Sequence, residues 1–240
     1  MYRRFGLMLS HMSETVPSRM GFLLAGGKSS RMGAGPGKDK AFLEFGGQTL
    51  LDRALDVMGK VCERVAIVGD PAKFTKNGSA KSVSSKSESS KYPSVVADIF
   101  PGCGPLAGIH AALVHSSADL NLMLAVDMPF VSRELLAFLF AAASYEANDA
   151  IVTVARSGKG LQPLCAVYRR DFSSVAEQAL RAGKYKIDAV FSSLPVRVIE
   201  EGELAAAGFS ERSFFNVNTP QDRLAAEGLA DVSGRPRPAR

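Results

Sequence analysis

Short apolar runs alternate with amphipathic segments along most of the chain. Residues 21–25 (GFLLA), 65–68 (VAIV) and 122–126 (LMLAV) are continuous apolar runs, which is typical of strands buried on both faces of a sheet. Between the first two runs, apolar residues recur at helical spacing from Leu51 to Met58. The order strand, loop, helix, strand predicts an α/β fold with a parallel sheet.

The rest of the chain continues this alternation. Further strands are predicted at residues 95–96, 150–154, 164–168, 196–199 and 214–217. Further helices are predicted after the glycine-rich turn 101–108, at 133–145, 171–181 and 187–193, and from Thr219 or Pro220 onward. The pattern as a whole predicts a Rossmann-like fold, in which a mostly parallel sheet carries helices on both faces.

Composition divides the chain into four parts. Residues 1–19 are predicted to be a loose N-terminal extension, and residues 20–230 a single domain. Within that domain, residues 77–91 contain seven serines and are predicted to form a surface loop. Residues 231–240, rich in Arg and Pro, are predicted to be a disordered tail.

The formal net charge of +5 comes from the ends of the chain rather than from its body. Without residues 1–20 and 231–240, 23 basic and 22 acidic residues remain. A nucleic-acid partner is therefore not expected, because it would need a basic stripe on the folded part. No stretch approaches the roughly 18 apolar residues of a membrane span, so no membrane partner is expected. Three widely spaced cysteines give no disulfide framework, which favours a cytoplasmic location.

A glycine-rich loop follows the first predicted strand, in the segment LLAGGKSSRMG (Leu23–Gly33). Glycine lets backbone N–H groups approach an anion, and Arg31 and Lys40 add positive charge nearby. A plain tight turn is the alternative for two glycines alone, but the whole run with Lys40 favours triphosphate binding. The spacing is neither that of a dinucleotide-binding G-x-G-x-x-G loop nor that of a Walker loop.

Two carboxylates follow predicted strands. Asp127 ends the run 122–126, and Asp98 follows Val95 and Val96. A carboxylate at the carboxyl edge of a sheet is a suitable ligand for Mg²⁺. The alternative for Asp127 is a helix cap, and its position alone does not decide between the two.

Asn216 and Asn218 lie in the segment FFNVNTPQD. Alternate positions of an extended segment point to the same side, and asparagine both donates and accepts hydrogen bonds. The pair therefore suits a polar substrate. The alternative for Asn218 is a helix cap, with Thr219 as the other candidate for that cap.

Five segments together resemble the molybdenum cofactor guanylyltransferases, in family order over about residues 20–225. They are LLAGGKSSRMG with DKAFLEFGGQTLLDR, DIFPGCGPLAG, AVDMPFV, LQPLCAVY and FFNVNTPQD. The resemblance implies a nucleotidyltransferase fold and an enzyme that transfers GMP from GTP to molybdopterin carrying molybdenum. The products would be the guanine dinucleotide cofactor and pyrophosphate, with Mg²⁺ as the cofactor of the reaction.

The resemblance also implies roles for particular residues. It places Lys40, Arg31 and Asp127 in catalysis and makes Asp127 the magnesium ligand. Asn216 and Asn218 fall on the pterin side. Binding to cofactor-supplying and acceptor proteins is implied by the resemblance alone. The implied GTP-binding residues are Leu24, Ala25, Gly26, Gly27, Arg31, Lys40, Asp98, Gly104 and Asp127.

The chain departs from the family pattern in two places near the predicted site. Residues 34–38 (AGPGK) lengthen the loop, so that Lys38 competes with Lys40 for the catalytic position; Asp39-Lys40-Ala41 keeps the family context. The family often has an asparagine near Val68 and Gly69, and this chain has none.

Three other functions stay open beside the guanylyltransferase. They are a cytidylyltransferase acting on the same cofactor, a sugar-phosphate nucleotidyltransferase, and a non-catalytic molybdenum cofactor chaperone. Leu24-Ala25-Gly26-Gly27 favours guanine over cytosine by its family resemblance, and the NVNTP segment argues against a sugar-phosphate substrate. Lys40 and Asp127, which a chaperone could lose, are both present.

Overall fold

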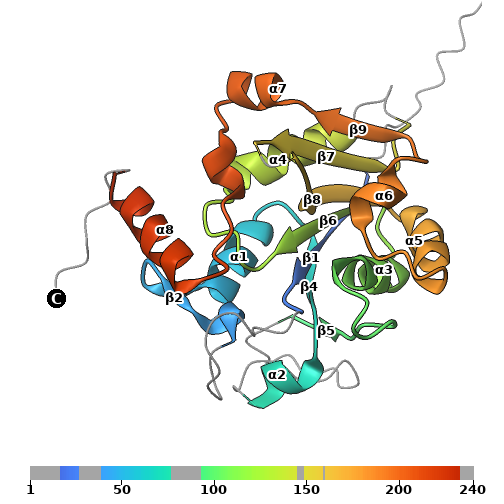
Figure 1. Ribbon diagram of the computed structural model, residues 1–240, viewed down its shortest axis with the longest axis horizontal. Helices are drawn as coiled ribbons and strands as arrows, with labels where there is room; N and C mark the ends of the chain where they lie inside the picture. Colours follow the sequence, from blue (N-terminus) through green and yellow to red (C-terminus); the bar gives the residue numbers. More distant parts are fainter. Residues whose placement is uncertain (1–16, 27–38, 77–92, 145–148, 159, 233–240) are drawn as a thin grey trace, which may run out of the picture.

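The computed structural model describes residues 17–26, 39–76, 93–144, 149–158 and 160–232 (Figure 1). Several features predicted from the sequence lie outside these ranges. They are Gly27, Arg31, the lengthened loop 34–38, the serine-rich segment 77–91, and most of the two terminal segments.

A seven-stranded sheet forms the centre of the structure, in the order β5-β4-β1-β6-β8-β7-β9. Within this sheet as described, β8 runs antiparallel to its neighbours β6 and β7, and the other strand pairs are parallel. The mostly parallel sheet predicted from the apolar runs is therefore confirmed. The strands are β1 (Arg19–Leu24), β4 (Arg64–Val68), β5 (Val95–Val96), β6 (Leu120–Ala125), β7 (Val152–Ser157), β8 (Gly160–Arg169) and β9 (Val196–Ile199).

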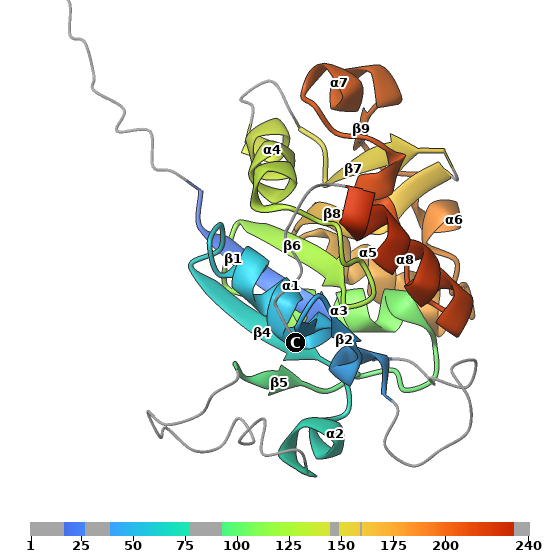
Figure 2. The ribbon, with the colours of Figure 1, turned by 90° about the vertical axis from the view of Figure 1, so that its left-hand side faces the viewer.

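Helices cover both faces of this sheet (Figure 1). On one face lie α1 (Leu50–Met58) and α4 (Arg133–Ser144), and on the other α3 (Pro105–His115), α5 (Phe172–Arg181) and α6 (Ile187–Phe191). Helices α2 (Pro71–Lys76) and α7 (Glu201–Ala206) lie at opposite ends of the sheet (Figure 2). The remaining elements are η1 (Lys40–Phe42), β2 (Glu44–Phe45), β3 (Gln48–Thr49), η2 (Glu211–Phe214) and α8 (Pro220–Val232).

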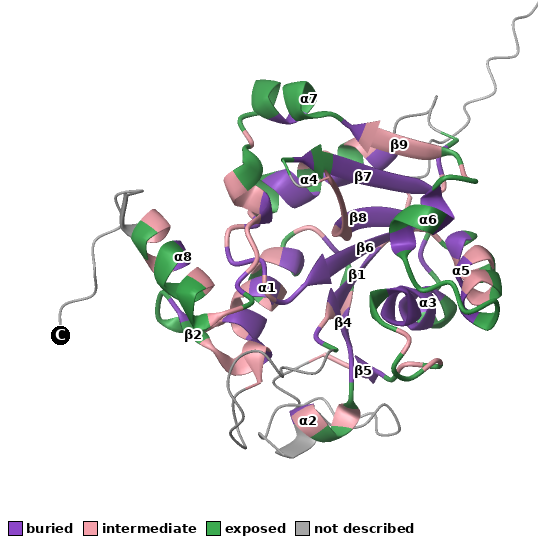
Figure 3. Cartoon of the chain, in the orientation of Figure 1, coloured by how far each residue is buried: buried purple, intermediate pink, exposed green. Residues whose placement is uncertain are grey.

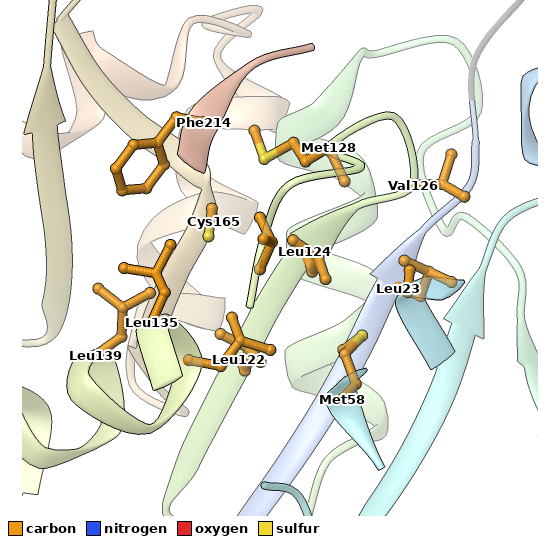
Figure 4. Close-up of a cluster of buried hydrophobic side chains, with 14 of the residues drawn as sticks. Leu23, Met58, Leu122, Leu124, Val126, Met128, Leu135, Leu139, Cys165 and Phe214 are labelled. Atoms are coloured by element: carbon orange, nitrogen blue, oxygen red, sulfur yellow. The ribbon is translucent and has the colours of Figure 1, made fainter. Parts of the chain in front are cut away.

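The central strands are apolar at most positions because alternate side chains enter two separate cores. In β6, Leu122 and Leu124 pack with α1 and α4, whereas Met123 packs with α3. In β1, Leu23 and Phe22 divide in the same way. The strands are consequently buried on both faces (Figure 3). Figure 4 shows part of the core that Leu122 and Leu124 form with α1 and α4.

Truncation of one of these side chains should measure the contribution of this packing. Leu122 is fully buried, and we expect Leu122→Ala to lower the free energy of unfolding by about 2–5 kcal/mol. Val114 is 54% exposed on α3, and Val114→Ala should change stability by less than about 0.5 kcal/mol. Urea unfolding of both variants tests this, and equal losses would contradict the described core.

The predicted strand at 214–217 is wrong. Phe214 ends the short helix η2, and the chain that follows joins no sheet. Phe214 and Val217 are nevertheless 3% and 2% exposed, because they pack into the core beside α4. The three apolar residues of this segment, Phe214, Phe215 and Val217, are compatible with either arrangement, and tertiary packing decided between them.

Described contacts and secondary structure extend into both predicted terminal segments. Ser18 bonds to the Asp119 carboxylate through its hydroxyl and its backbone N–H, so ordered contacts begin inside the predicted extension. Helix α8 reaches Val232, two residues into the predicted tail. Within the described ranges, no helix combines the length and the apolar character needed to cross a bilayer.

Candidate active site

The carboxyl ends of β1, β4, β5 and β6 lie at one edge of the sheet, because these strands are parallel. Backbone hydrogen bonds continue beyond the strands. The N–H of Ala25 donates to Val68 O at 2.9 Å, and that of Val126 to Leu24 O at 3.2 Å. The start of the predicted nucleotide loop, Leu24–Gly26, is therefore fixed between the ends of β4 and β6.

Gly69 passes close to this loop. A Cβ atom on Gly69 would lie 3.4 Å from both Ala25 C and Gly26 N, which is van der Waals contact with the loop backbone. The position near which the family often has an asparagine is thus a close backbone approach in this chain. Gly69 therefore offers no side chain that could contact a nucleotide.

Asp98 and the start of α3 lie against the same loop. A Cβ atom on Gly108 would be 3.5 Å from Leu24 Cδ2 and 3.7 Å from Asp98 Oδ1. Burial raises the pKa of the Asp98 carboxyl above its ordinary value. Gly104, with φ of 77°, makes the turn into α3, and Pro105 begins the helix. Asp98 and Gly104, which the resemblance includes among the GTP-binding residues, therefore both flank the start of α3.

Lys40 is brought to this edge by the short helix η1. Asp39 caps that helix by accepting from Ala41 N, and its other oxygen pairs with Lys73 Nζ at 2.9 Å. From there, Lys40 Nζ donates to Asn218 Oδ1 at 2.6 Å and lies 3.5 Å from Asp127 Oδ2. Three residues singled out in the sequence, 178 positions apart at the extremes, thus meet in one place.

One carboxylate oxygen of Asp127 lies toward Lys40, and the other has no hydrogen-bond partner in the part of the chain that the structure describes. Its Oδ1 is buried and makes no hydrogen bond among the described residues. Burial raises the pKa of Asp127 above the ordinary value, although the Lys40 ammonium acts in the opposite direction. A buried carboxylate oxygen that lacks a donor fits a cation ligand, since burial without a partner is costly.

The residues present suit a Mg²⁺ ion shared between the protein and a nucleotide better than a metal ion held by protein side chains alone. Within the described ranges, no group of three or more His, Cys, Asp or Glu residues could hold a metal. Magnesium is commonly bound by one or two carboxylates together with substrate phosphates and water. Asp127 could supply the carboxylate, and a nucleotide the remaining oxygens.

The turn after Asp127 is held from several sides. Arg53 Nε donates to Pro129 O at 2.6 Å, and the Phe130 ring packs edge-on against Phe45 and Phe215. Leu124, Val126 and Met128 belong to the buried cluster on the same stretch of chain (Figure 4). The Asp127 carboxylate is therefore carried by a rigid turn.

Asn216 and Asn218 do not share one environment, although their alternate spacing predicts that they do. Asn216 Nδ2 donates to Phe214 O at 3.2 Å, which is a local turn contact. Asn218 instead contacts Lys40. Thr219, not Asn218, provides the side-chain cap of α8, because its hydroxyl accepts from Asp222 N.

Arg53, Lys73 and Asp222 were not predicted from the sequence as residues of this region. Arg53 and Lys73 act through contacts distant in the sequence, and no local signal marks them. Asp222 was detectable, because Thr219-x-x-Asp222 has the spacing of a capping box.

A pocket of about 490 Å³ lies beside this region, between the start of α4 and the α7–η2 connection. Phe130, Ser132, Glu134, Phe209, Arg212 and Ser213 are among its lining residues. Lys40 and Asp127 do not line it, so it is distinct from the place where these two residues meet.

Comparison with known proteins places the chain in a family. The family model of the MobA-like NTP transferase domain matches residues 21–198. A probable molybdenum cofactor guanylyltransferase of Pelotomaculum thermopropionicum is 37% identical, over 89% of this chain and 94% of the relative. The molybdenum cofactor guanylyltransferase of Desulfosudis oleivorans is 32% identical, over 86% of this chain and 93% of the relative.

Solved structures agree with this. Molybdopterin-guanine dinucleotide biosynthesis protein A of Archaeoglobus fulgidus has a TM-score of 0.70 and 27% identity, over 89% of this chain and 99% of its own. The 2-C-methyl-D-erythritol 4-phosphate cytidylyltransferase of Thermus thermophilus has a TM-score of 0.56 at 23% identity, over 88% of this chain and 98% of its own, which shows a shared fold alone. The chain thus belongs to the molybdenum cofactor guanylyltransferase family, with a MobA-like NTP transferase domain, and is a nucleotidyltransferase.

Proposed function

We propose that this enzyme transfers GMP from GTP to molybdopterin carrying molybdenum, forming the guanine dinucleotide cofactor and releasing pyrophosphate. The observation that carries the proposal is the meeting of Lys40 and Asp127, 3.5 Å apart, beside the loop that starts at Leu24. A cation and a buried carboxylate at the carboxyl edge of a parallel sheet suit a magnesium-bound triphosphate. The names of the relatives supply the substrate class.

Lys40 and Asp127 have separate tasks in this mechanism. Lys40 neutralises negative charge on the phosphates as the leaving group develops. Asp127 would hold Mg²⁺, and its Oδ1 atom has no donor among the described residues. When bound, the ion supplies charge neutralisation on the phosphate oxygens. Gly27 and Arg31 keep the GTP-binding roles that the family resemblance implies.

The reaction itself asks little covalent chemistry of the protein. An oxygen of the terminal phosphate of molybdopterin attacks the α-phosphorus of GTP in line. The new P–O bond forms as the bond between the α-phosphorus and the bridging oxygen breaks, and the electron pair leaves with pyrophosphate. No general base is needed, because the attacking phosphate is already ionised near neutral pH.

Asp98 and Gly104 flank the nucleoside in this proposal. Gly104 precedes the first residue of α3, and Asp98 Oδ1 and Leu24 Cδ2 both lie close to Gly108 in that helix. Asn216 and Asn218 are assigned to the pterin side by resemblance. We place the reaction in the cytoplasm, an assignment supported by the free thiols of Cys62, Cys103 and Cys165.

The test is to incubate the enzyme with molybdopterin carrying molybdenum, Mg²⁺, and GTP or CTP. The attached nucleotide is identified by mass spectrometry, and pyrophosphate release is measured in parallel. We expect GMP to be attached at a much higher rate than CMP. A preference for CTP would make the enzyme a cytidylyltransferase, and no product with either nucleotide would refute the proposal.

A further inference from the structure

The first turn of α8 has a capping box that reaches into the candidate active site. Asp222 Oδ2 accepts from the backbone N–H groups of Asn218, at 2.9 Å, and Thr219, at 2.8 Å. The N–H of Asp222 donates in turn to Thr219 Oγ1 at 3.1 Å. One carboxylate therefore fixes the backbone at Asn218.

The fixed segment contacts both central residues of the site. Asn218 Oδ1 accepts from Lys40 Nζ at 2.6 Å. One residue earlier, the N–H of Val217 donates to Asp127 O at 2.8 Å, and the Val217 side chain is buried. The segment from Val217 to Asp222 thus connects the lysine and the aspartate, which come from different parts of the chain.

Lys40 needs such a support. A lysine side chain has many rotamers, and its ammonium is a point charge without the fixed geometry of a guanidinium. The Lys40 ammonium reaches its place 3.5 Å from Asp127 Oδ2 by way of the Asn218 acceptor. Charge stabilisation in a transition state depends on this kind of preorganisation.

We propose that Asn218 and Asp222 are positioning residues for Lys40. Asp222 fixes the backbone of Asn218, and the side-chain amide oxygen of Asn218 holds the Lys40 ammonium beside Asp127. This inference rests on the proposed function, because it takes Lys40 as the group that neutralises phosphate charge. It assigns to Asn218 a role within the protein and gives Asp222 a role beyond capping α8.

The chain contains a matched control for the capping box. At the start of α1, Asp52 N donates to Thr49 Oγ1 at 3.0 Å, and Thr49 Oγ1 donates to Asp52 Oδ2 at 2.9 Å. This cap also has a threonine and an aspartate three residues apart. Asp52→Ala should therefore destabilise the protein in the way that Asp222→Ala does, without a link through Asn218 to Lys40.

The experiment compares Asn218→Ala, Asp222→Ala, their double variant, Asp52→Ala and Lys40→Ala. Turnover and the KM for GTP are measured, with the thermal midpoint of each variant. The reactivity of Lys40 toward acetic anhydride is followed by mass spectrometry without nucleotide, with Lys60 as the internal reference because its side chain is 51% exposed. This second readout does not depend on catalysis.

We expect Asn218→Ala to lower kcat about tenfold, the effect of losing one hydrogen bond to a charged group. Asp222→Ala should change kcat in the same direction, and the double variant should be no slower than Asn218→Ala, because the residues act in series. The ratio of Lys40 reactivity to Lys60 reactivity should be higher in both single variants than in the wild type. Asp52→Ala should lower the thermal midpoint alone, and Asn218→Asp, which keeps an acceptor, should protect Lys40 as the wild type does.

The outcomes separate this inference from the proposed function. If Lys40→Ala turns over normally, the role of Lys40 fails and the inference fails with it. If Lys40→Ala is impaired while Asn218→Ala and Asp222→Ala keep wild-type turnover and Lys40 reactivity, the inference alone is overturned. Fully additive losses in the double variant would also overturn it.

Discussion

Lys40→Ala is expected to lower turnover by on the order of 10²-fold or more, as for the loss of a preorganised charge in a site that excludes water. The Lys40 ammonium lies 3.5 Å from Asp127 Oδ2 and has a side chain only 21% exposed, so solvent replaces it poorly. The loss should be found in kcat, because the charge it stabilises grows as pyrophosphate leaves. Pyrophosphate release at saturating GTP and Mg²⁺ measures it.

A control for this variant is Lys60→Ala. Lys60 pairs with Asp56 on an exposed surface, and its removal should leave turnover unchanged. Lys40→Arg keeps the charge but not the shape of the ammonium, so partial activity is expected. Near-normal turnover in Lys40→Ala would remove Lys40 from the mechanism.

Asp127→Asn should abolish magnesium-dependent turnover while making the nucleotide-free protein more stable. The amide keeps the size of the side chain but loses the charge that would hold the cation. Burial raises the pKa of Asp127 in the folded protein. The ionised carboxylate therefore opposes folding once the pH exceeds the pKa of an ordinary aspartate, which is the pKa it has in the unfolded chain. Removing the charge should therefore raise the thermal midpoint at neutral pH, and the gain over wild type should shrink as the pH falls.

The measurements for Asp127→Asn are a magnesium titration of turnover and thermal unfolding without nucleotide at several pH values. Asp56→Asn, on an exposed carboxylate, serves as the control and should change neither. A variant that responds to Mg²⁺ as the wild type does would contradict the role of Asp127. Loss of stability with loss of activity would indicate a merely structural effect.

The central part of the fold was predictable because its strands are buried on both faces. The runs at 21–25, 65–68 and 122–126 are continuous because alternate residues enter different cores, and the structure confirms each as a strand. The predicted strand at 214–217 failed for a related reason. Its apolar residues are buried by packing against other elements, and no strand is needed for that.

The site was predictable only in part. Asp98 and Asp127 were predicted to lie at this edge because a carboxylate after a buried strand is a local pattern, and Lys40 was singled out because it follows a glycine-rich loop. The contact between Lys40 and Asn218 spans 178 positions, and no local pattern predicts it. The same holds for Arg53, which supports the turn after Asp127 from the first helix. Gly27 and Arg31 lie outside the described residues and stay predictions.

The most direct test of the central claim is a crystal structure with Mn²⁺ and a GTP analogue that cannot be cleaved between the α- and β-phosphates. Manganese replaces magnesium and is located by its anomalous scattering. We predict a manganese peak within coordination distance of the Asp127 carboxylate, with the triphosphate between the Leu24–Gly26 loop and Lys40. A cation away from Asp127, with the phosphates bound outside the reach of Lys40, would contradict the account.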